Sequence, residues 1–241
     1  MSDKKLTLII PYRRRKEHLS VFLNWFTNKK YHDFEAIIIE SDDEPYLQKE
    51  LSDYFNINYL HCEESRNSVF HLSKYLNLGL ANAKSGFICP FDIDLIPYND
   101  ALNRHYKIAS TTPHIVSGYR LNVSIENWKN PSLGELEICS EDSHSALKKH
   151  LTTHEKFGVC PIFKKEYLEA ISGWDEKFKG WGAEDQDITE RYMTEAQSHF
   201  LRSPELVYLH IKHDYDEFWK TEGLVQENRA YYAMKNSSTD S

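Results

Sequence analysis

The chain has 241 residues, with 29 basic and 37 acidic side chains, a formal net charge of −8, four cysteines and 13% aromatic residues. A chain of this length and aromatic content can bury one sizeable core, which excludes a disordered protein. The acidic balance excludes a broad basic face for nucleic acid, and the four scattered cysteines, which form no C-x-x-C pair, are expected to be buried free thiols.

No apolar run reaches 18 residues, and the first residues lead into a short strand-like run instead of the apolar core of a signal peptide. These two observations predict a cytoplasmic protein. Peripheral contact with the inner face of a membrane stays open, and no pattern indicates the oligomeric state.

The first half of the chain alternates between apolar runs and helical periodicity. Strands are predicted at residues 6–10, 34–39, 53–60 and 86–91, and amphipathic helices at 16–28 and 68–83. Continuous apolar strands separated by helices predict an α/β fold with a mostly parallel central sheet covered by helices on both faces.

The second half is less regular. Strands are predicted at residues 115–119, 157–163 and 206–211, and helices at 164–171, 184–196 and 216–234. The polar, aperiodic stretch 122–154 is predicted to be a surface excursion, and residues 235–241 a frayed tail.

Polar residues follow three of the predicted parallel strands at their carboxyl ends. They are the cationic run 13–16, the acidic run 40–43 and the pair Asp92 and Asp94. Ligands bind at this edge of such sheets, so the three segments should converge on one pocket. There the cations can bind phosphate through guanidinium groups, although a solvated basic loop explains them equally well.

Asp92 and Asp94 are two residues apart at a strand end, where alternate side chains share a face. Two adjacent carboxylates suit a divalent cation such as Mg²⁺ or Mn²⁺, while a solvated turn or a helix cap is the plainer interpretation. His210 and His213 end the last predicted strand. Alone they are typical surface residues, but together with the aspartates they would make a mixed oxygen and nitrogen site.

Residues 180–187 read Gly-Trp-Gly-Ala-Glu-Asp-Gln-Asp. Acidic residues in the first turn of a helix are common because the helix dipole and capping favour them. The two glycines around Trp181 are not explained in that way. An indole beside a carboxylate suits a sugar, and a carboxylate placed there can act as a base toward an attacking hydroxyl.

With these motifs in place, the sequence resembles the beta-1,4-galactosyltransferase family and, more broadly, nucleotide-sugar glycosyltransferases of the GT-A fold, as a soluble bacterial-type member. Residues 10–19 are similar to the family's opening nucleotide-binding motif, 91–100 to its D-x-D segment, 180–187 to G-W-G-G-E-D-D-D, and 210–213 to M-x-x-H.

The resemblance implies a Rossmann-like GT-A domain over residues 1–234. It divides into a nucleotide-sugar-binding half at 1–121 and a smaller acceptor and catalytic half at 122–234, followed by the flexible tail 235–241. It also implies a loop at 214–227 that closes over donor and metal.

The resemblance also assigns roles to single residues. Asp185 would be the catalytic base and Glu184 would bind sugar hydroxyls, with Trp181 and Gly182 in the same acceptor and sugar pocket. Mn²⁺ or Mg²⁺ would be held by Asp94, His210 and His213. The nucleotide-sugar would be bound by residues from three segments: Pro11, Tyr12, Arg13, Arg15, Asp42, Phe70, Asp92, Ile93 and Asp94.

This sequence departs from the family pattern at several positions. Leu72 replaces an arginine that follows Phe70, a role that Arg14, Arg66 or His71 could take over. His210 replaces a methionine ligand, which alters the metal preference. Ala183 replaces a glycine and Gln186 an aspartate.

The predicted function is an inverting, metal-dependent transfer of a galactose-type or N-acetylgalactosamine-type sugar from a UDP-sugar to a hydroxyl of a saccharide or glycolipid. Two alternatives are a nucleotidyltransferase acting on sugar phosphates and a non-catalytic module that binds a nucleotide-sugar or a carbohydrate. A nucleotidyltransferase would require a glycine-rich phosphate-binding loop after the first strand, and residues 12–16 contain no glycine. The second would not need Asp92, Asp94 or Asp185.

Overall fold

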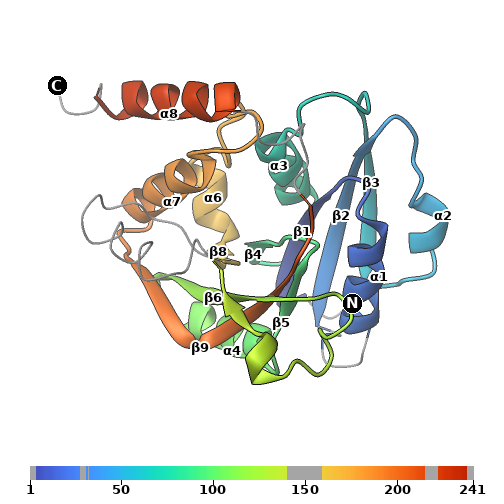
Figure 1. Ribbon diagram of the computed structural model, residues 1–241. Helices are drawn as coiled ribbons and strands as arrows, with labels where there is room; N and C mark the ends of the chain where they lie inside the picture. The colour runs from blue at the N-terminus through green and yellow to red at the C-terminus, as the bar shows by residue number, and fades with distance from the viewer. Residues whose placement is uncertain (1–3, 28–30, 32, 140–158, 215–221, 238–241) are drawn as a thin grey trace.

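The computed structural model describes residues 4–27, 31, 33–139, 159–214 and 222–237. Its elements form two sheets with helices around them (Figure 1). The larger sheet has the order β3-β2-β1-β4-β8, built from Leu6–Tyr12 (β1), Phe34–Asp42 (β2), Ile57–Glu63 (β3), Phe87–Pro90 (β4) and Phe163–Lys164 (β8). The first four of these strands are parallel and β8 is antiparallel. The prediction of an α/β fold with a mostly parallel sheet is confirmed for this part.

Helices cover both faces of this sheet. Successive residues of β1 point to opposite faces, and since all of them are apolar or buried, both faces need a covering layer. Leu8 and Ile10 lie in one core with residues of α1 (Lys16–Phe26) and α2 (Gln48–Leu51), while Ile9 lies in a second core. The second core includes residues of α3 (Leu72–Asn82), α6 (Lys165–Ala170) and α7 (Glu184–Glu195). α3 approaches β1 so closely that a Cβ on Gly79 would lie 2.2 Å from Ile9 Cγ2.

A second, smaller sheet has the order β5-β9-β6-β7. It consists of Leu95–Pro97 (β5), Ile115–Val123 (β6), Glu137–Ile138 (β7) and Phe200–Ile211 (β9). β6 and β9 are parallel, and β5 and β7 are antiparallel to their neighbours. No local pattern in the sequence predicts this mixed sheet, because β5 has three residues and its partner β9 lies more than a hundred residues away along the chain.

The helix α4 (Ala101–Thr111) is joined to the small sheet by a buried histidine. The Nδ1 atom of His105 lies 2.8 Å from Tyr208 Oη in β9, and its Nε2 lies 2.6 Å from the Val116 carbonyl oxygen in β6. Burial lowers the pKa of His105 to about 4. This histidine is therefore neutral and structural at physiological pH.

Several predicted boundaries differ from the structure. The strand predicted at 53–60 is β3 at Ile57–Glu63, and the strand predicted at 206–211 is the end of the longer β9. The stretch 122–154 begins inside β6 and continues through a 3₁₀ turn (Leu133–Glu135) and β7, and residues 140–158 lie outside the described part. Of the strand predicted at 157–163, the described residues show β8 and one bridge between Val159 and Gly118.

The C-terminal helix α8 spans Glu222–Ser237. It therefore includes part of the predicted loop 214–227, of which residues 215–221 lie outside the described part, and it extends past Met234 into the predicted tail. The tail prediction is wrong at Lys235, whose ammonium group pairs with Asp175 at 2.9 Å and with Asp187 at 2.6 Å. Among the described residues, no helix is both long and apolar enough to cross a membrane.

Candidate active site

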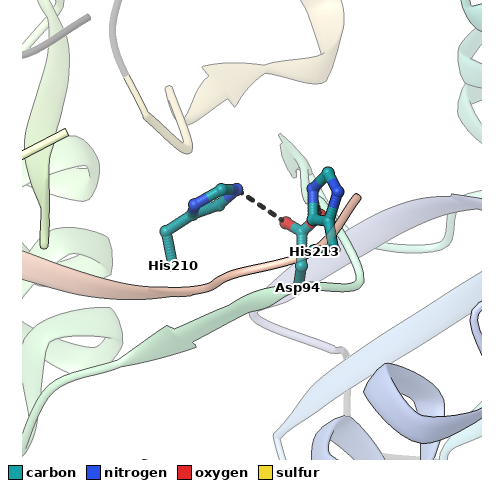
Figure 2. A group of neighbouring side chains, drawn as sticks. All are labelled: Asp94, His210 and His213. Carbon is teal, nitrogen blue, oxygen red and sulfur yellow. Dashed lines mark ion pairs between the residues drawn. The ribbon is translucent and has the colours of Figure 1, made fainter. Parts of the chain in front are cut away.

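Asp94, His210 and His213 meet where the two sheets approach each other. Asp94 precedes β5, His210 is the register partner of Leu95 in β9, and His213 lies just beyond the end of β9. One ligand atom from each of the three residues lies within 4.8 Å of the others. Figure 2 shows the His210 ring reaching toward the Asp94 carboxylate, beside which the ring of His213 lies. The three predicted metal ligands are thus brought together.

Hydrogen bonds turn both imidazoles so that Nε2 faces the carboxylate. His213 Nδ1 donates to the Asp214 carbonyl oxygen at 2.7 Å, and its Nε2 lies 3.0 Å from Asp94 Oδ2. His210 Nδ1 lies 2.9 Å from Asn122 Oδ1, and its Nε2 lies 3.8 Å from Asp94 Oδ1. In metal sites, histidine ligands are commonly oriented by an acceptor on the other ring nitrogen.

The Asp94 carboxylate itself fits a cation. It is 7% exposed, and its Oδ1 atom is buried without a hydrogen-bond partner among the described residues. Although burial opposes ionisation, the hydrogen bond from His213 and the charges of His210 and Arg15 lower the pKa of Asp94. An ionised carboxylate beside two imidazole nitrogens is a donor set for Mn²⁺ or a similar ion, so the residues present fit a divalent metal.

A second group of acidic residues faces the same region. Desolvation, followed by the charges of Asp94 and Asp185, raises the pKa of Asp92 to about 7. Burial and the charge of Asp185 raise the pKa of Glu184 to about 8, and burial also raises the pKa of Asp185. The side chains of Asp92 and Asp185 are exposed to solvent, yet the surrounding protein desolvates both carboxylates. Groups at the bottom of a recess have both properties.

Arg120, in β6, is a site residue that the sequence analysis missed. Its positive charge opposes the upward pKa shifts of both Asp92 and Asp185. No local pattern indicates a functional role for Arg120, because it directly follows the strand predicted at 115–119 and belongs to no motif. Its role as a counter-charge depends on β6 lying beside β9 in the small sheet.

The acidic residues in the first turn of α7 have three different environments. Glu184 is 4% exposed and accepts a hydrogen bond from the Gly182 N–H at 2.6 Å. Asp185 is exposed. Asp187 is buried and pairs with Arg191 at 2.7 Å and with Lys235, so it is a structural residue. Its structural role comes from these ion pairs and not from capping, since no side chain caps the start of α7 by a hydrogen bond.

The glycine–tryptophan–glycine turn is held from two sides. Gly182 has a φ of +123°, and Gly180 donates its N–H to the Phe70 carbonyl oxygen at 3.2 Å. Asn228 of α8 donates to the carbonyl oxygens of Lys179 and Trp181. These bonds join the predicted sugar pocket around the half-buried Trp181 to the predicted nucleotide contact Phe70.

The cationic run after β1 divides into three roles. The Arg13 guanidinium is buried, donates to both Ser41 and Ser68, and lies 5.2 Å from the Phe70 ring centre. Arg14 makes a two-point ion pair with Asp42, at 2.6 and 2.7 Å. Arg15 donates to Asp94 Oδ2 at 3.1 Å and belongs to the metal cluster.

The proposed replacements for the missing arginine at Leu72 are also engaged elsewhere. Arg66 pairs with Asp43 at 2.7 Å, and His71 Nε2 lies 2.8 Å from the Glu176 carbonyl oxygen. Arg14 and Arg66 line a recess of about 460 Å³, together with Tyr12, Asp42 and Tyr46. This recess adjoins the cationic run but does not include the Asp94 cluster.

The remaining predicted nucleotide contacts differ in burial. Ile93 and Tyr12 are buried, at 4% and 3% exposed, and Pro11 and Phe70 are partly exposed. His18, which the sequence analysis did not single out, lies beside the metal cluster. Its ring packs edge-to-face against His213 with the ring centres 5.8 Å apart, and its Nε2 has no hydrogen-bond partner among the described residues.

Two family models match the sequence. The model of glycosyl transferase family 2 matches residues 7–172, more than half of the chain. A model described as the N-terminal domain of galactosyltransferase matches residues 142–214.

Curated relatives point in the same direction. Beta-1,4-galactosyltransferase 1 of Homo sapiens is 26% identical over 204 residues, which cover 82% of this chain and 39% of the relative. Chondroitin synthase of Escherichia coli is 23% identical over 226 residues, covering 79% of this chain and 32% of the relative. The chain spans about two fifths of the length of the mammalian relative.

Solved structures share the fold. TarS 1–349 of S. aureus in complex with UDP-GlcNAc has a TM-score of 0.65 at 15% identity, covering 90% of this chain and 61% of that one. The catalytic domain of Drosophila beta1,4galactosyltransferase 7, in complex with xylobiose, has a TM-score of 0.58 at 15% identity, covering 94% and 79%. The fold is therefore GT-A.

Proposed function

Because the chain belongs to glycosyl transferase family 2, we propose that it transfers a sugar from a UDP-sugar to a hydroxyl of a saccharide or glycolipid, with inversion at the anomeric carbon. The observation that carries this proposal is the meeting of Asp94, His210 and His213 at the sheet edge that also holds Asp92. The names of the curated relatives favour a galactose-type donor.

Asp185 is proposed as the base that takes the proton from the acceptor hydroxyl. Its pKa is raised by burial, which makes the carboxylate a stronger base, while the nearby charge of Arg120 favours the ionised form that a base needs. The exposed position of Asp185 at the start of α7 leaves it accessible to an acceptor.

Glu184 and Asp92 have different tasks in this proposal. With a pKa of about 8, Glu184 is largely protonated at neutral pH and can donate a hydrogen bond to a sugar oxygen. Asp92 is proposed to accept hydrogen bonds from hydroxyl groups of the donor, and Trp181 to stack on a sugar face.

A divalent cation held by Asp94, His210 and His213 would neutralise the charge that develops on the leaving diphosphate. Arg15, which donates to Asp94, is the cationic side chain proposed to orient the diphosphate at this place. The buried Arg13 supports the nucleotide pocket indirectly, because it fixes Ser41, Ser68 and Phe70 relative to one another.

The proposal is tested first by binding. Thermal unfolding is followed with a panel of nucleotide sugars, each with Mn²⁺ or Mg²⁺, and a UDP-sugar is expected to raise the midpoint when the metal is present. Asp94→Ala should abolish this metal-dependent rise. A rise of equal size in Asp94→Ala would contradict the metal site.

Transfer is tested next with the donor found in that panel and a set of saccharide acceptors. Formation of a glycosidic product separates a transferase from a binding module, and release of UDP without a sugar-nucleotide product separates it from a nucleotidyltransferase. The cytoplasmic location and the membrane contact remain proposals that cell fractionation would test.

A further inference from the structure

Asn122 lies directly behind the proposed metal ligand His210. The two residues are register partners in the parallel strands β6 and β9, and Asn122 Oδ1 lies 2.9 Å from His210 Nδ1. We propose that Asn122 is the positioning residue that makes His210 a metal ligand. The inference rests on the metal site of the proposed function.

The chemical reason is the choice of tautomer. A neutral imidazole carries one N–H and one lone pair, and a carboxamide oxygen can only accept a hydrogen bond. The Asn122 oxygen therefore places the hydrogen of His210 on Nδ1 and the lone pair on Nε2. That nitrogen faces Asp94 Oδ1 at 3.8 Å, on the side where a cation would bind.

The Asn122 side chain is fixed by a second donor. Cys139 Sγ lies 3.0 Å from the same amide oxygen, and Cys139 is 2% exposed. Its backbone N–H donates to the Arg120 carbonyl oxygen at 3.2 Å. The thiol of Cys139 donates to the Asn122 oxygen, and this bond favours the orientation in which the oxygen, not the amide nitrogen, points toward His210.

The neighbouring chain holds this arrangement in register. Lys212 N donates to the Val123 carbonyl oxygen at 3.0 Å, and Lys212 Nζ pairs with Glu137 of β7 at 2.8 Å. His210 is thus clamped between β5 on one side and β6 on the other. Its ring orientation is set before any ion binds, which lowers the entropic cost of coordination.

The experiment measures metal binding to the whole chain by titration calorimetry, without donor or acceptor. Asn122→Leu removes the acceptor at similar volume and should weaken Mn²⁺ and Co²⁺ binding about 10- to 100-fold. Asn122→Asp keeps an acceptor oxygen and should retain native affinity. Cys139→Ala removes the second donor but leaves the acceptor oxygen of Asn122, so it should weaken metal binding less than Asn122→Leu does.

Two further measurements separate positioning from a general structural effect. In a His210→Ala background, Asn122→Leu should cause no additional loss of affinity, and the visible absorption of bound Co²⁺ should change in Asn122→Leu as it does in His210→Ala. An equal additional loss in that background would overturn the inference. Thermal unfolding without metal checks that each variant is folded, and Asn122→Ala replaces the leucine variant if the latter is not.

Failure of the inference is distinguishable from failure of the proposed function. If the native chain binds neither Mn²⁺ nor Co²⁺, the metal site of the proposed function is wrong. If it binds them and Asn122→Leu binds them equally well, the site stands and the role of Asn122 is wrong.

Discussion

The first turn of helix α7 carries acidic residues in opposite electrostatic settings. Asp187 pairs with Arg191 and shares the ammonium group of Lys235 with Asp175, which precedes the helix. Glu184 and Asp185 instead form a group with Asp92, and the pKa values of all three are raised. Neighbouring residues of one helix thus form an ion-paired cluster and a cluster whose charges repel.

The difference separates stability from function. The ion pairs of Lys235 with Asp175 and Asp187 hold α8 against α7. Removing one partner of such a pair would destabilise the fold, because the other partner would keep a partly buried charge without its counter-charge. The repelling carboxylates cost stability, and such a cost persists where the groups have a chemical task. The following substitutions test whether the two clusters divide in this way.

The largest effect is expected for Asp185→Asn. It removes the proposed base and one of the repelling charges, so transfer should fall about 10²- to 10⁴-fold while stability stays unchanged or rises. Turnover with the donor found by screening and urea unfolding measure the two quantities. Glu195→Gln, an exposed position at the end of α7, is the control. Transfer near the native rate would remove Asp185 as the base.

Asp187→Asn should show the reverse pattern. It leaves Arg191 and Lys235 without their shared buried carboxylate and should lower the free energy of unfolding by about 2–4 kcal/mol, discounted from a fully buried pair because both cations are partly exposed. Urea unfolding measures the loss. The rate of transfer per folded molecule should remain close to native, and a selective loss of rate in a stable variant would contradict a structural role.

Glu184→Gln should change how stability depends on pH. The raised pKa means that the folded protein keeps a proton that the unfolded chain releases, so stability is lost as pH rises from about 5 toward 8. The contribution is at most about 1.4 kcal/mol for each pH unit in this window. Unfolding free energies at pH 6 and pH 8 should differ less in the variant than in the native chain. An unchanged difference would show that Glu184 ionises normally.

Ala183→Gly is expected to have the smallest effect. Ala183 has a φ of +67°, a left-handed conformation that glycine adopts without the steric cost of a Cβ. Because glycine also makes the unfolded chain more flexible, we expect a net gain of about 0.5–1 kcal/mol, seen as a higher unfolding midpoint. Ala196→Gly, at the ordinary helical end of α7, should instead destabilise.

Much of the larger sheet could be predicted from the sequence. β1, β2 and β4 are short apolar runs, and α1 and α3 show helical periodicity, so each element is encoded by residues next to one another. The strand ends suggested a site that combines His210 and His213 with the aspartates, the family resemblance singled out Asp94, and the geometry confirms the proximity of the three residues. The second sheet was missed because its strands pair over long distances in the chain.

The separate roles of Arg13, Arg14 and Arg15 could not be predicted. All three are arginines, yet their partners differ. Arg13 donates to Ser41 and Ser68, Arg14 to Asp42, and Arg15 to Asp94. A side chain's partner depends on which strand lies beside it and on the local backbone, such as the φ of +53° at Arg14. The same holds for Arg120, which no pattern singled out.

Local patterns in the chain are sufficient for the α/β class, the positions of most helices and strands, and the residue types needed for a cation and a base, because these depend on spacing and on strand ends. The tertiary structure alone decides which carboxylates are paired, which imidazole nitrogen faces Asp94, and that Asn122 lies behind His210. Those features depend on contacts between β5, β6 and β9, whose residues are distant in sequence and become neighbours only when the small sheet forms.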